Sequence, residues 1–175
     1  GCVLSALCIF GSQNKKAELL STVFLFFSSV ISIYIYINID VFQDTYVIYN
    51  WISFANINLN ISILLDPLTA IMFCVVTIVS AVVHMFSIGY MHEDQNRARF
   101  FCYLSLFTFA MLVLVSADNF IQLFLGWEGV GLCSYLLVGY YFHKPSANNA
   151  AIKAFLVNRV GDFGYLIAIA LIYKY

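Results

Sequence analysis

The sequence predicts an all-α integral membrane protein: a transmembrane helix bundle of five full spans plus a partial first span, with a short β-hairpin in the loop between spans two and three. Two observations favour this fold class. Hydrophobic residues make up 63% of the 175 residues, and charged residues make up only 10%. A water-soluble domain usually carries about 25% charge. In addition, the apolar residues form long runs of the ~20 residues that a helix needs to cross a bilayer.

Five of these apolar runs are long enough to be complete spans. They cover residues 19–39, 67–91, 100–117, 119–142 and 147–173. A run at residues 1–10 is interpreted as the remnant of a first span, because it is too short to cross the membrane alone. Asp66 followed by Pro67 is a favourable helix start, since aspartate caps free N–H groups and a proline in the first turn loses no hydrogen bond. Polar breaks at residues 117–119 and 144–146 separate the last three spans.

Residues 40–66 follow a different pattern. From residue 57 to residue 63, apolar and polar side chains alternate without interruption. This is the period of a strand with one wet face. Residues 46–49 are a suitable partner strand, with Trp51 and Asn56 in or near the connection. We therefore predict a short hairpin on one side of the membrane.

The charges of the connections indicate the orientation of the spans. Alternate connections carry the basic residues Lys15, Lys16, Arg97, Arg99 and Lys144. The two remaining connections carry only acidic residues, at positions 40, 44, 66 and 118. By the positive-inside rule, the basic connections face the negatively charged compartment, matrix or cytoplasm, and the hairpin faces the other side.

Other chemical signals in the sequence are weak. The first five residues, GCVLS, fit an N-terminal acylation pattern, but a lipid anchor is redundant on a chain with five spans. The five cysteines form no CxxC pair and no Cys/His cluster, so we interpret them as small buried residues rather than disulfide or metal ligands. The sequence contains no phosphate-binding loop, no nucleotide fingerprint and no nucleophile–base arrangement. It also lacks the basic surface of a nucleic-acid-binding protein.

Four charged residues lie inside the predicted spans: Glu128, Lys153, Arg159 and Asp162. A charged group near the bilayer centre costs about 2.5–3.5 kcal/mol even on a lenient scale. Such groups persist where they face the bundle interior, pair with one another or line a water path. These four residues are therefore our candidates for a proton pathway.

Glu128 is the clearest candidate. It lies roughly 13 Å deep in its span, near the middle of a ~30 Å hydrocarbon core. Gly126, Gly129 and Gly131 flank it and allow a neighbouring helix to come close. A carboxyl that is buried alone keeps its proton, whereas a nearby cation favours the ionised form. A carboxyl that can be switched between these states suits a proton relay, and a protonated carboxyl that serves only packing is the alternative.

The last span supplies the other three candidates. Arg159 and Asp162 are three residues apart, so they share a helix face and can pair. Arg159 lies about 12 residues from the start of a helix that runs opposite to the Glu128 helix, so the two residues should lie at similar depth. We therefore predict that Glu128, Arg159 and Asp162 are neighbours. The alternative is that Arg159 and Asp162 form an ion pair that only fixes the rotation of their helix. Lys153 is either part of the pathway or a side chain that snorkels to the interface.

The three histidines are weaker candidates. His84 lies late in its span and could relay protons, since histidine titrates near neutral pH. The alternative is a polar residue that is satisfied within the bundle. His92 and His143 lie near the interface, where Tyr140 and Tyr141 suit an aromatic belt.

A series of motifs carries a resemblance to a known family. They are FSIGYM at 86–91, FCYLSLFTF at 101–109, ADNF at 117–120, GWEGVGLCSYLL at 126–137 and KAFLVNRVGD at 153–162. In this order and spacing they closely resemble chain 5 of NADH:ubiquinone oxidoreductase, respiratory complex I. The resemblance is dense from about residue 64 onward and looser before it. Chains 2 and 4 of that complex and cation/proton antiporter subunits share the architecture, but they do not usually carry the GWEGVGLCSYLL stretch.

The resemblance implies an antiporter-like, proton-translocating subunit at the distal end of the membrane arm of this enzyme. It implies that Glu128 is central to the proton pathway and that Arg159 and Asp162 belong to a polar part of the sixth helix that is linked to this pathway. The resemblance is weaker at Lys153, because the lysine at this position is not uniform among relatives. It places no cofactor in this chain: NADH, FMN, iron–sulfur clusters and ubiquinone are expected elsewhere in the complex. The expected partners are other membrane-arm subunits, especially chain 4 and the remaining C-terminal part of chain 5, and membrane lipids, but no nucleic acid.

The family subunit is much longer than this chain. Residues 1–175 match the N-terminal part of the antiporter-like domain, helices one to six, without the lysine of the seventh helix that pairs with the glutamate. We expect that the chain does not pump alone and favour a subunit made in separate pieces, over a chain that continues past Tyr175 or a degenerate remnant. Two other functions stay open: a structural or assembly piece of complex I without a proton path, and part of a stand-alone cation/proton antiporter. The expected location is the mitochondrial inner membrane, with a bacterial plasma membrane as the alternative.

Overall fold

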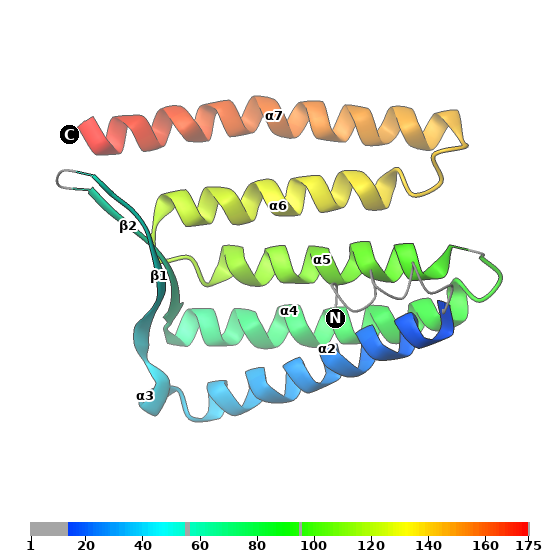
Figure 1. Ribbon diagram of the computed structural model, residues 1–175, viewed down its shortest axis with the longest axis horizontal. Coiled ribbons are helices and arrows are strands. Elements are labelled where there is room, and N and C mark those ends of the chain that lie inside the picture. The colour runs from blue at the N-terminus through cyan, green and yellow to red at the C-terminus, as the bar shows by residue number, and fades with distance from the viewer. Residues whose placement is uncertain (1–13, 55–56, 95, 175) are drawn as a thin grey trace.

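The computed structural model describes residues 14–54, 57–94 and 96–174 and consists of long helices with one hairpin (Figure 1). In chain order the elements are α2 (Asn14–Ile37), α3 (Ile39–Phe42), β1 (Asp44–Phe54), β2 (Ile57–Leu65), α4 (Pro67–Tyr90), α5 (Arg97–Val115), α6 (Phe120–Val138) and α7 (Pro145–Lys174). The partial first span, the acylation pattern, Cys2, Cys8 and Asn56 lie outside the described residues. The five predicted full spans are confirmed, because α2, α4, α5, α6 and α7 are each long and apolar enough to cross a membrane.

The ends of the helices differ slightly from the prediction. Asp66 caps α4 as expected, since its side chain accepts a hydrogen bond from the Thr69 N–H at 2.6 Å. Hydrogen bonds from Thr69 also lower the pKa of Asp66. The break at residues 144–146 was misplaced: Pro145 opens α7, where its missing N–H costs nothing, and the turn lies at residues 139–144.

Helices α4 to α7 form one layer, and α2 packs against it. Figure 1 shows α4, α5, α6 and α7 side by side in sequence order, and α2 packs against α4 and α5. Short turns join consecutive helices of the layer, so neighbours run antiparallel. The starts of α2, α5 and α7, which carry Lys15, Lys16, Arg97 and Arg99 with Lys144 just before α7, lie at one end of the bundle. The hairpin lies at the opposite end, as the charge pattern predicted.

The packing of α4 indicates which solvent surrounds the bundle. Its buried side chains are small or polar: Thr69, Ala70, Thr77, Ala81, His84 and Ser87. Its outward face carries branched and aromatic side chains instead, among them Val79 (57% exposed) and Phe86 (70% exposed). A helix in water would bury its large apolar residues, whereas helices in lipid pack through small residues and turn apolar residues outward. The chain is therefore a multi-pass membrane protein.

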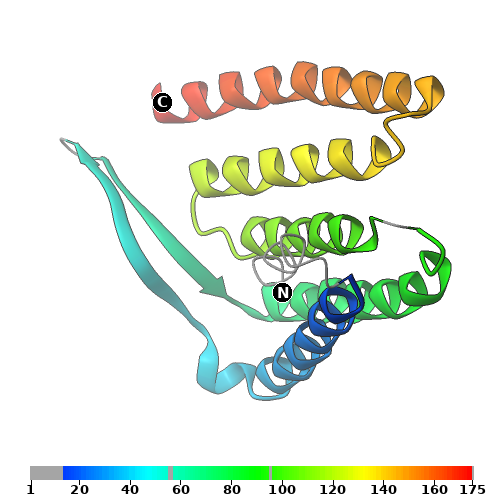
Figure 2. The ribbon, with the colours of Figure 1, turned by 45° about the vertical axis from the view of Figure 1, so that its right-hand side comes forward.

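The predicted hairpin is confirmed, and it is longer than the sequence pattern suggested. β1 and β2 pair antiparallel from Asp44↔Leu65 to Phe54↔Ile57, with irregularities between Val47 and Tyr49 and between Asn50 and Ile52. Trp51 therefore lies within β1 and not in the connection. Figure 2 shows that the hairpin projects from the ends of the helices.

The prediction of a simple wet face on the hairpin was wrong near its base. Ser62 belongs to the polar side of the alternation but is fully buried, whereas Ile61 is 38% exposed. The cause is a polar contact with the α5–α6 turn. The Ser62 hydroxyl donates to Asp118 Oδ2 at 3.2 Å, and Asn119 Nδ2 donates to the Asn60 carbonyl at 2.8 Å.

Gln122 of α6 completes this contact by acting as a strand partner for β2. The Ser62 N–H donates to Gln122 Oε1 at 3.0 Å, and Gln122 Nε2 donates to the Ser62 carbonyl at 2.7 Å. The Leu64 N–H donates to the Ser116 carbonyl at 3.0 Å. These bonds satisfy backbone groups of β2 that face away from β1, so this edge of the strand is covered.

Replacing Gln122 by alanine is expected to loosen the hairpin from the bundle. The substitution leaves the N–H and the carbonyl of Ser62 without partners, and each orphaned buried group costs about 1–3 kcal/mol. Amide hydrogen exchange at Ser62 should therefore rise at least about tenfold. Gln43→Ala is the matched control, because Gln43 is exposed at the same end of the bundle. Equal exchange in the two variants would show that Gln122 does not hold the strand.

Candidate functional site

Glu128 and Arg159 form an ion pair between α6 and α7. Arg159 Nη1 lies 2.5 Å from Glu128 Oε1, and the exposed fractions of the two side chains are 45% and 22%. Glu128 is near the middle of α6 and Arg159 near the middle of α7. The two antiparallel helices thus bring both charges to the same level, as the depth estimate from the sequence required.

Asp162 adds a second carboxylate to the pair. Its Oδ2 lies 3.7 Å from Arg159 Nη1, and its side chain is buried with 7% exposed. Its other oxygen, Oδ1, accepts a hydrogen bond of 2.9 Å from the indole N–H of Trp127. The predicted neighbourhood of Glu128, Arg159 and Asp162 is therefore present, with one guanidinium between two carboxylates.

Trp127 is a member of this cluster that sequence reasoning missed. It directly precedes Glu128, so one turn of α6 supplies both an indole donor and a carboxylate to α7. A buried carboxylate needs hydrogen-bond donors. A tryptophan next to an acid in the middle of a span is a pattern from which the sequence could have predicted such a donor.

Aromatic and glycine contacts set the position of the cluster. The Arg159 guanidinium lies 4.7 Å from the centre of the Phe155 ring, which in turn packs against Tyr135. A cation held over an aromatic face loses orientational freedom and is stabilised electrostatically. On α6, Gly131 faces the Asn158 side chain of α7, and a Cβ added at Gly131 would lie 3.6 Å from Asn158 Nδ2, an ordinary contact distance.

Gly126 and Gly129 face the other neighbour of α6. A Cβ added at Gly126 would lie 2.6 Å from Leu114 Cα, and one added at Gly129 would lie 3.1 Å from Ala110 Cβ. Gly126 and Gly129 therefore permit the close approach of a neighbouring helix, α5, as the sequence predicted.

Lys153 is not part of the cluster. It lies six residues before Arg159 on α7, its side chain is exposed, and within the described part of the chain it has no ion-pair partner. Its place near the basic end of α7 agrees with a side chain that reaches the interface.

His84 lies in a separate, buried polar network between α4 and α5. Its Nδ1 is 2.9 Å from the Ser80 carbonyl and its Nε2 is 3.2 Å from the Ser105 hydroxyl. A carbonyl only accepts hydrogen bonds, so Nδ1 carries the hydrogen in the neutral ring and Nε2 accepts from Ser105. Both ring nitrogens have partners, as expected for a polar residue that is satisfied within the bundle. His92 and His143 are exposed in turns at the basic end.

Glu18 forms a further ion pair that the sequence did not indicate. Its carboxylate lies 3.0 Å from Arg97 Nη1, with exposed fractions of only 5% for Glu18 and 14% for Arg97. The pair joins α2 to α5 at the basic end of the bundle. In the sequence, Glu18 follows Lys15 and Lys16, a pattern typical of the solvent-exposed start of a helix. Its partner Arg97 lies 79 residues away, so the sequence alone does not connect the two residues.

Two family models match the chain in succession. One describes NADH-Ubiquinone oxidoreductase (complex I), chain 5 N-terminus, and matches residues 51–101. The other describes NADH:quinone oxidoreductase/Mrp antiporter, TM, and matches residues 117–175. The second match includes all four predicted site residues.

Similar proteins agree with these matches. NADH-quinone oxidoreductase subunit L of Rickettsia felis is 49% identical over 177 residues, which cover 99% of this chain and 27% of that protein. NADH-ubiquinone oxidoreductase chain 5 of Marchantia polymorpha is 65% identical over 106 residues, which cover 61% of this chain and 16% of that protein. The chain thus spans about a quarter of the length of the Rickettsia felis protein, and its match spans less of the Marchantia polymorpha protein.

A solved structure shares the arrangement of the helices. A chain in the structure of the Mrp complex from Dietzia sp. DQ12-45-1b matches with a TM-score of 0.73 and 26% identity. The match covers 97% of this chain and 19% of that chain. The hairpin and the helix layer together are therefore an arrangement that this Mrp complex also contains.

Proposed function

The chain belongs to the family of complex I chain 5 and bacterial subunit L, as its N-terminal part, and we propose that it contributes half of a proton-translocation path in the distal membrane arm of that complex. The observation that supports this most is the Glu128–Arg159–Asp162 cluster in the middle of two spans. Charges at this depth are costly and persist where a function needs them. The path would be coupled to NADH oxidation and ubiquinone reduction elsewhere in the assembly.

The cluster suggests how a proton is taken up and released. In the structure, the Arg159 guanidinium is the ion-pair partner of the Glu128 carboxylate. A small shift of the guanidinium toward Asp162, which Trp127 holds in place, would leave Glu128 without a cation, and a proton from the path would take the place of that cation. Return of Arg159 would then release the proton. A change in the charge state along the membrane arm, driven by ubiquinone reduction, would bias Arg159 between its two partners.

The remaining parts of the proposal concern the assembly. Lys153 would lie near the basic entrance of the path, because it is closer than Arg159 to the basic end of α7. NADH, FMN, iron–sulfur clusters and ubiquinone would bind in other subunits. The partners would be membrane-arm subunits, above all chain 4 and the rest of chain 5. We propose the mitochondrial inner membrane as the location, supported by the high identity with the relative from Marchantia polymorpha.

The test of this function is the variant Glu128→Gln in the whole assembly, in sealed vesicles. Glutamine keeps the size and a hydrogen-bond acceptor for Arg159 but cannot carry the proton. We expect fewer protons moved per NADH oxidised, with NADH:ubiquinone reduction and the amount of assembled complex unchanged. Glu93→Gln is the matched control, because Glu93 is exposed in the α4–α5 turn.

The other outcomes separate the alternative functions. An unchanged proton yield in Glu128→Gln would mean that the chain is a structural or assembly piece of the complex. Cation-driven proton movement that needs neither NADH nor ubiquinone would favour the antiporter, whose family model also covers residues 117–175.

A further inference from the structure

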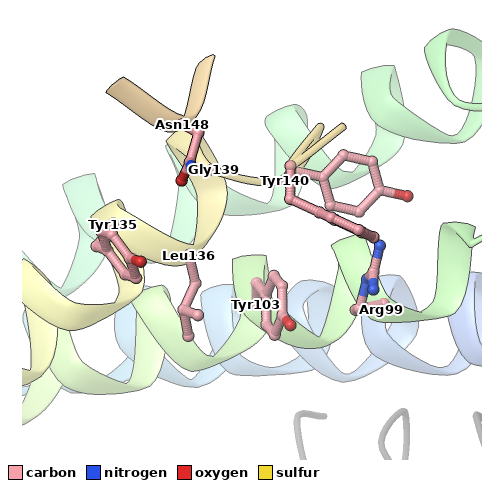
Figure 3. A pocket seen from close by; sticks show the side chains of 8 residues that line it. Arg99, Tyr103, Tyr135, Leu136, Gly139, Tyr140 and Asn148 are labelled. Carbon is pink, nitrogen blue, oxygen red and sulfur yellow. The ribbon is translucent and has the colours of Figure 1, made fainter. Parts of the chain in front are cut away.

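A pocket of about 200 Å³ opens at the basic end of the bundle, between α5, α6 and the start of α7. Figure 3 shows Tyr103 and Arg99 on one side, Tyr135 and Leu136 on another, and Asn148 above them. Arg99 and Asn148 belong to the first turns of α5 and α7, and Tyr140 is the second residue after the end of α6. The pocket therefore lies at the level of the membrane–water interface and is separate from the Glu128 cluster.

Arg99 is the cation of this pocket. Its guanidinium carbon lies 5.4 Å from the centre of the Tyr140 ring and 5.3 Å from that of Phe142. Its Nε is buried and has no hydrogen-bond partner, and no carboxylate in the described part of the chain forms an ion pair with it. The two aromatic rings orient the guanidinium but leave its charge unneutralised.

Asp94, in the α4–α5 turn, already accepts a hydrogen bond of 2.7 Å from the Asn96 N–H. Its Oδ1 accepts a hydrogen bond of 3.0 Å from the Tyr140 hydroxyl. Burial, together with this hydrogen bond to Asp94, raises the pKa of Tyr140, so the phenol stays neutral and keeps donating. The pocket thus presents one positive charge with hydroxyl and amide groups around it, a combination that suits an anion.

An apolar groove continues the pocket toward the middle of the membrane. A second pocket of about 180 Å³ follows the seam between α5 and α6. Its lining includes Leu106, one turn beyond Tyr103 on α5, and Cys133, one turn before Leu136 on α6. Residues one turn apart share a helix face, so the two pockets lie end to end. Phe109 at 61% and Leu132 at 47% exposed border this groove.

We propose that the pocket and the groove together bind one anionic phospholipid, with its phosphate on Arg99 and an acyl chain along the α5–α6 seam. Such a lipid has a charged phosphate, a headgroup at the membrane surface and an apolar acyl chain. The charge of Arg99, the interfacial position of the pocket and the apolar groove match these three parts in their order across the membrane. Basic pockets between spans on the negatively charged side are suited to acidic headgroups. The phosphate supplies the counter-ion that Arg99 lacks, and Asn148 and Tyr135 offer hydrogen bonds to the headgroup.

The test uses the whole assembly in phosphatidylcholine vesicles with a trace of phosphatidylglycerol that carries a photoreactive acyl chain. After illumination, the cross-linked peptides are identified by mass spectrometry. We expect labelling of the α5 and α6 segments that line the groove, and at least a tenfold loss of this labelling in Arg99→Gln. Leu136→Trp, which fills the pocket and keeps every charge, should cause the same loss. Lys144→Gln removes a charge on the same side outside the pocket and should label like the wild type.

The remaining arms distinguish the sources of the phosphate group. Unlabelled phosphatidylglycerol should displace the probe, whereas inorganic phosphate should not, and a photoreactive phosphatidylcholine should not label the groove. Displacement by inorganic phosphate would overturn the lipid assignment in favour of a free-anion site. Labelling that does not depend on Arg99 or on the headgroup, or no labelling because another subunit covers the groove, would also overturn it.

Discussion

Replacing Gly126 by alanine is expected to disrupt the packing of α6 on α5 and to deplete the assembled protein. The new Cβ would lie 2.6 Å from Leu114 Cα and 2.7 Å from Leu114 N. These are backbone atoms, so no side-chain rotation relieves the clash and the helices must separate. Overpacking typically costs about 1–3 kcal/mol, and a contact against backbone lies at or above the top of that range. A loss of this size lowers the abundance of a protein several-fold.

The same substitution should also damage the function, because Gly126 and Glu128 lie on the same turn of α6 and move together. The measurement is the amount and the thermal midpoint of the assembled complex, compared with Gly164→Ala. Gly164 lies on α7 with nothing within 4 Å of an added Cβ. There, alanine favours the helix by about 0.5–1 kcal/mol and should be neutral or stabilising. Wild-type levels of Gly126→Ala would show that the α5–α6 contact tolerates a wider spacing.

Replacing Arg159 by glutamine is expected to stop proton transfer through this chain and to destabilise its fold. Glu128 and Asp162 would lose their shared cation in the middle of two spans. Removing one partner of a fully buried ion pair costs about 3–5 kcal/mol, and because the Arg159 side chain is 45% exposed, the cost here should fall below that range. Glu128 would then have no cation whose movement could exchange with a proton.

A double-mutant cycle separates the two effects of this substitution. Glu128→Gln/Arg159→Gln removes one of the stranded acids, so it should be more stable than Arg159→Gln alone. Arg159→Lys keeps the charge but lacks the planar fork, and we expect it to restore stability better than proton transfer. The measurements are the thermal midpoint of the complex and the protons moved per NADH oxidised. Additive losses in the cycle would mean that Glu128 and Arg159 do not act as a pair.

The sequence by itself determined the features that depend on the local cost of placing residues in lipid or water. Apolar runs located α2, α4, α5, α6 and α7, because a span is a property of consecutive residues. Alternation located the hairpin, and Asp66–Pro67 located a helix start. Loop charges predicted which helix ends lie together. The depth of Glu128 and Arg159 followed from counting residues along two helices, and this was sufficient to predict that they are neighbours.

The tertiary structure alone decided the features that depend on how the helices rotate and on which distant residues meet. The bond of Trp127 to Asp162 and the ion pair of Glu18 with Arg97 join residues whose types fit many partners. Ser62 is buried despite its place on the polar side of a strand, because Gln122, 60 residues away, binds its backbone. The sequence marks a polar residue as costly in a membrane, but only the packing of the helices determines which partner offsets that cost.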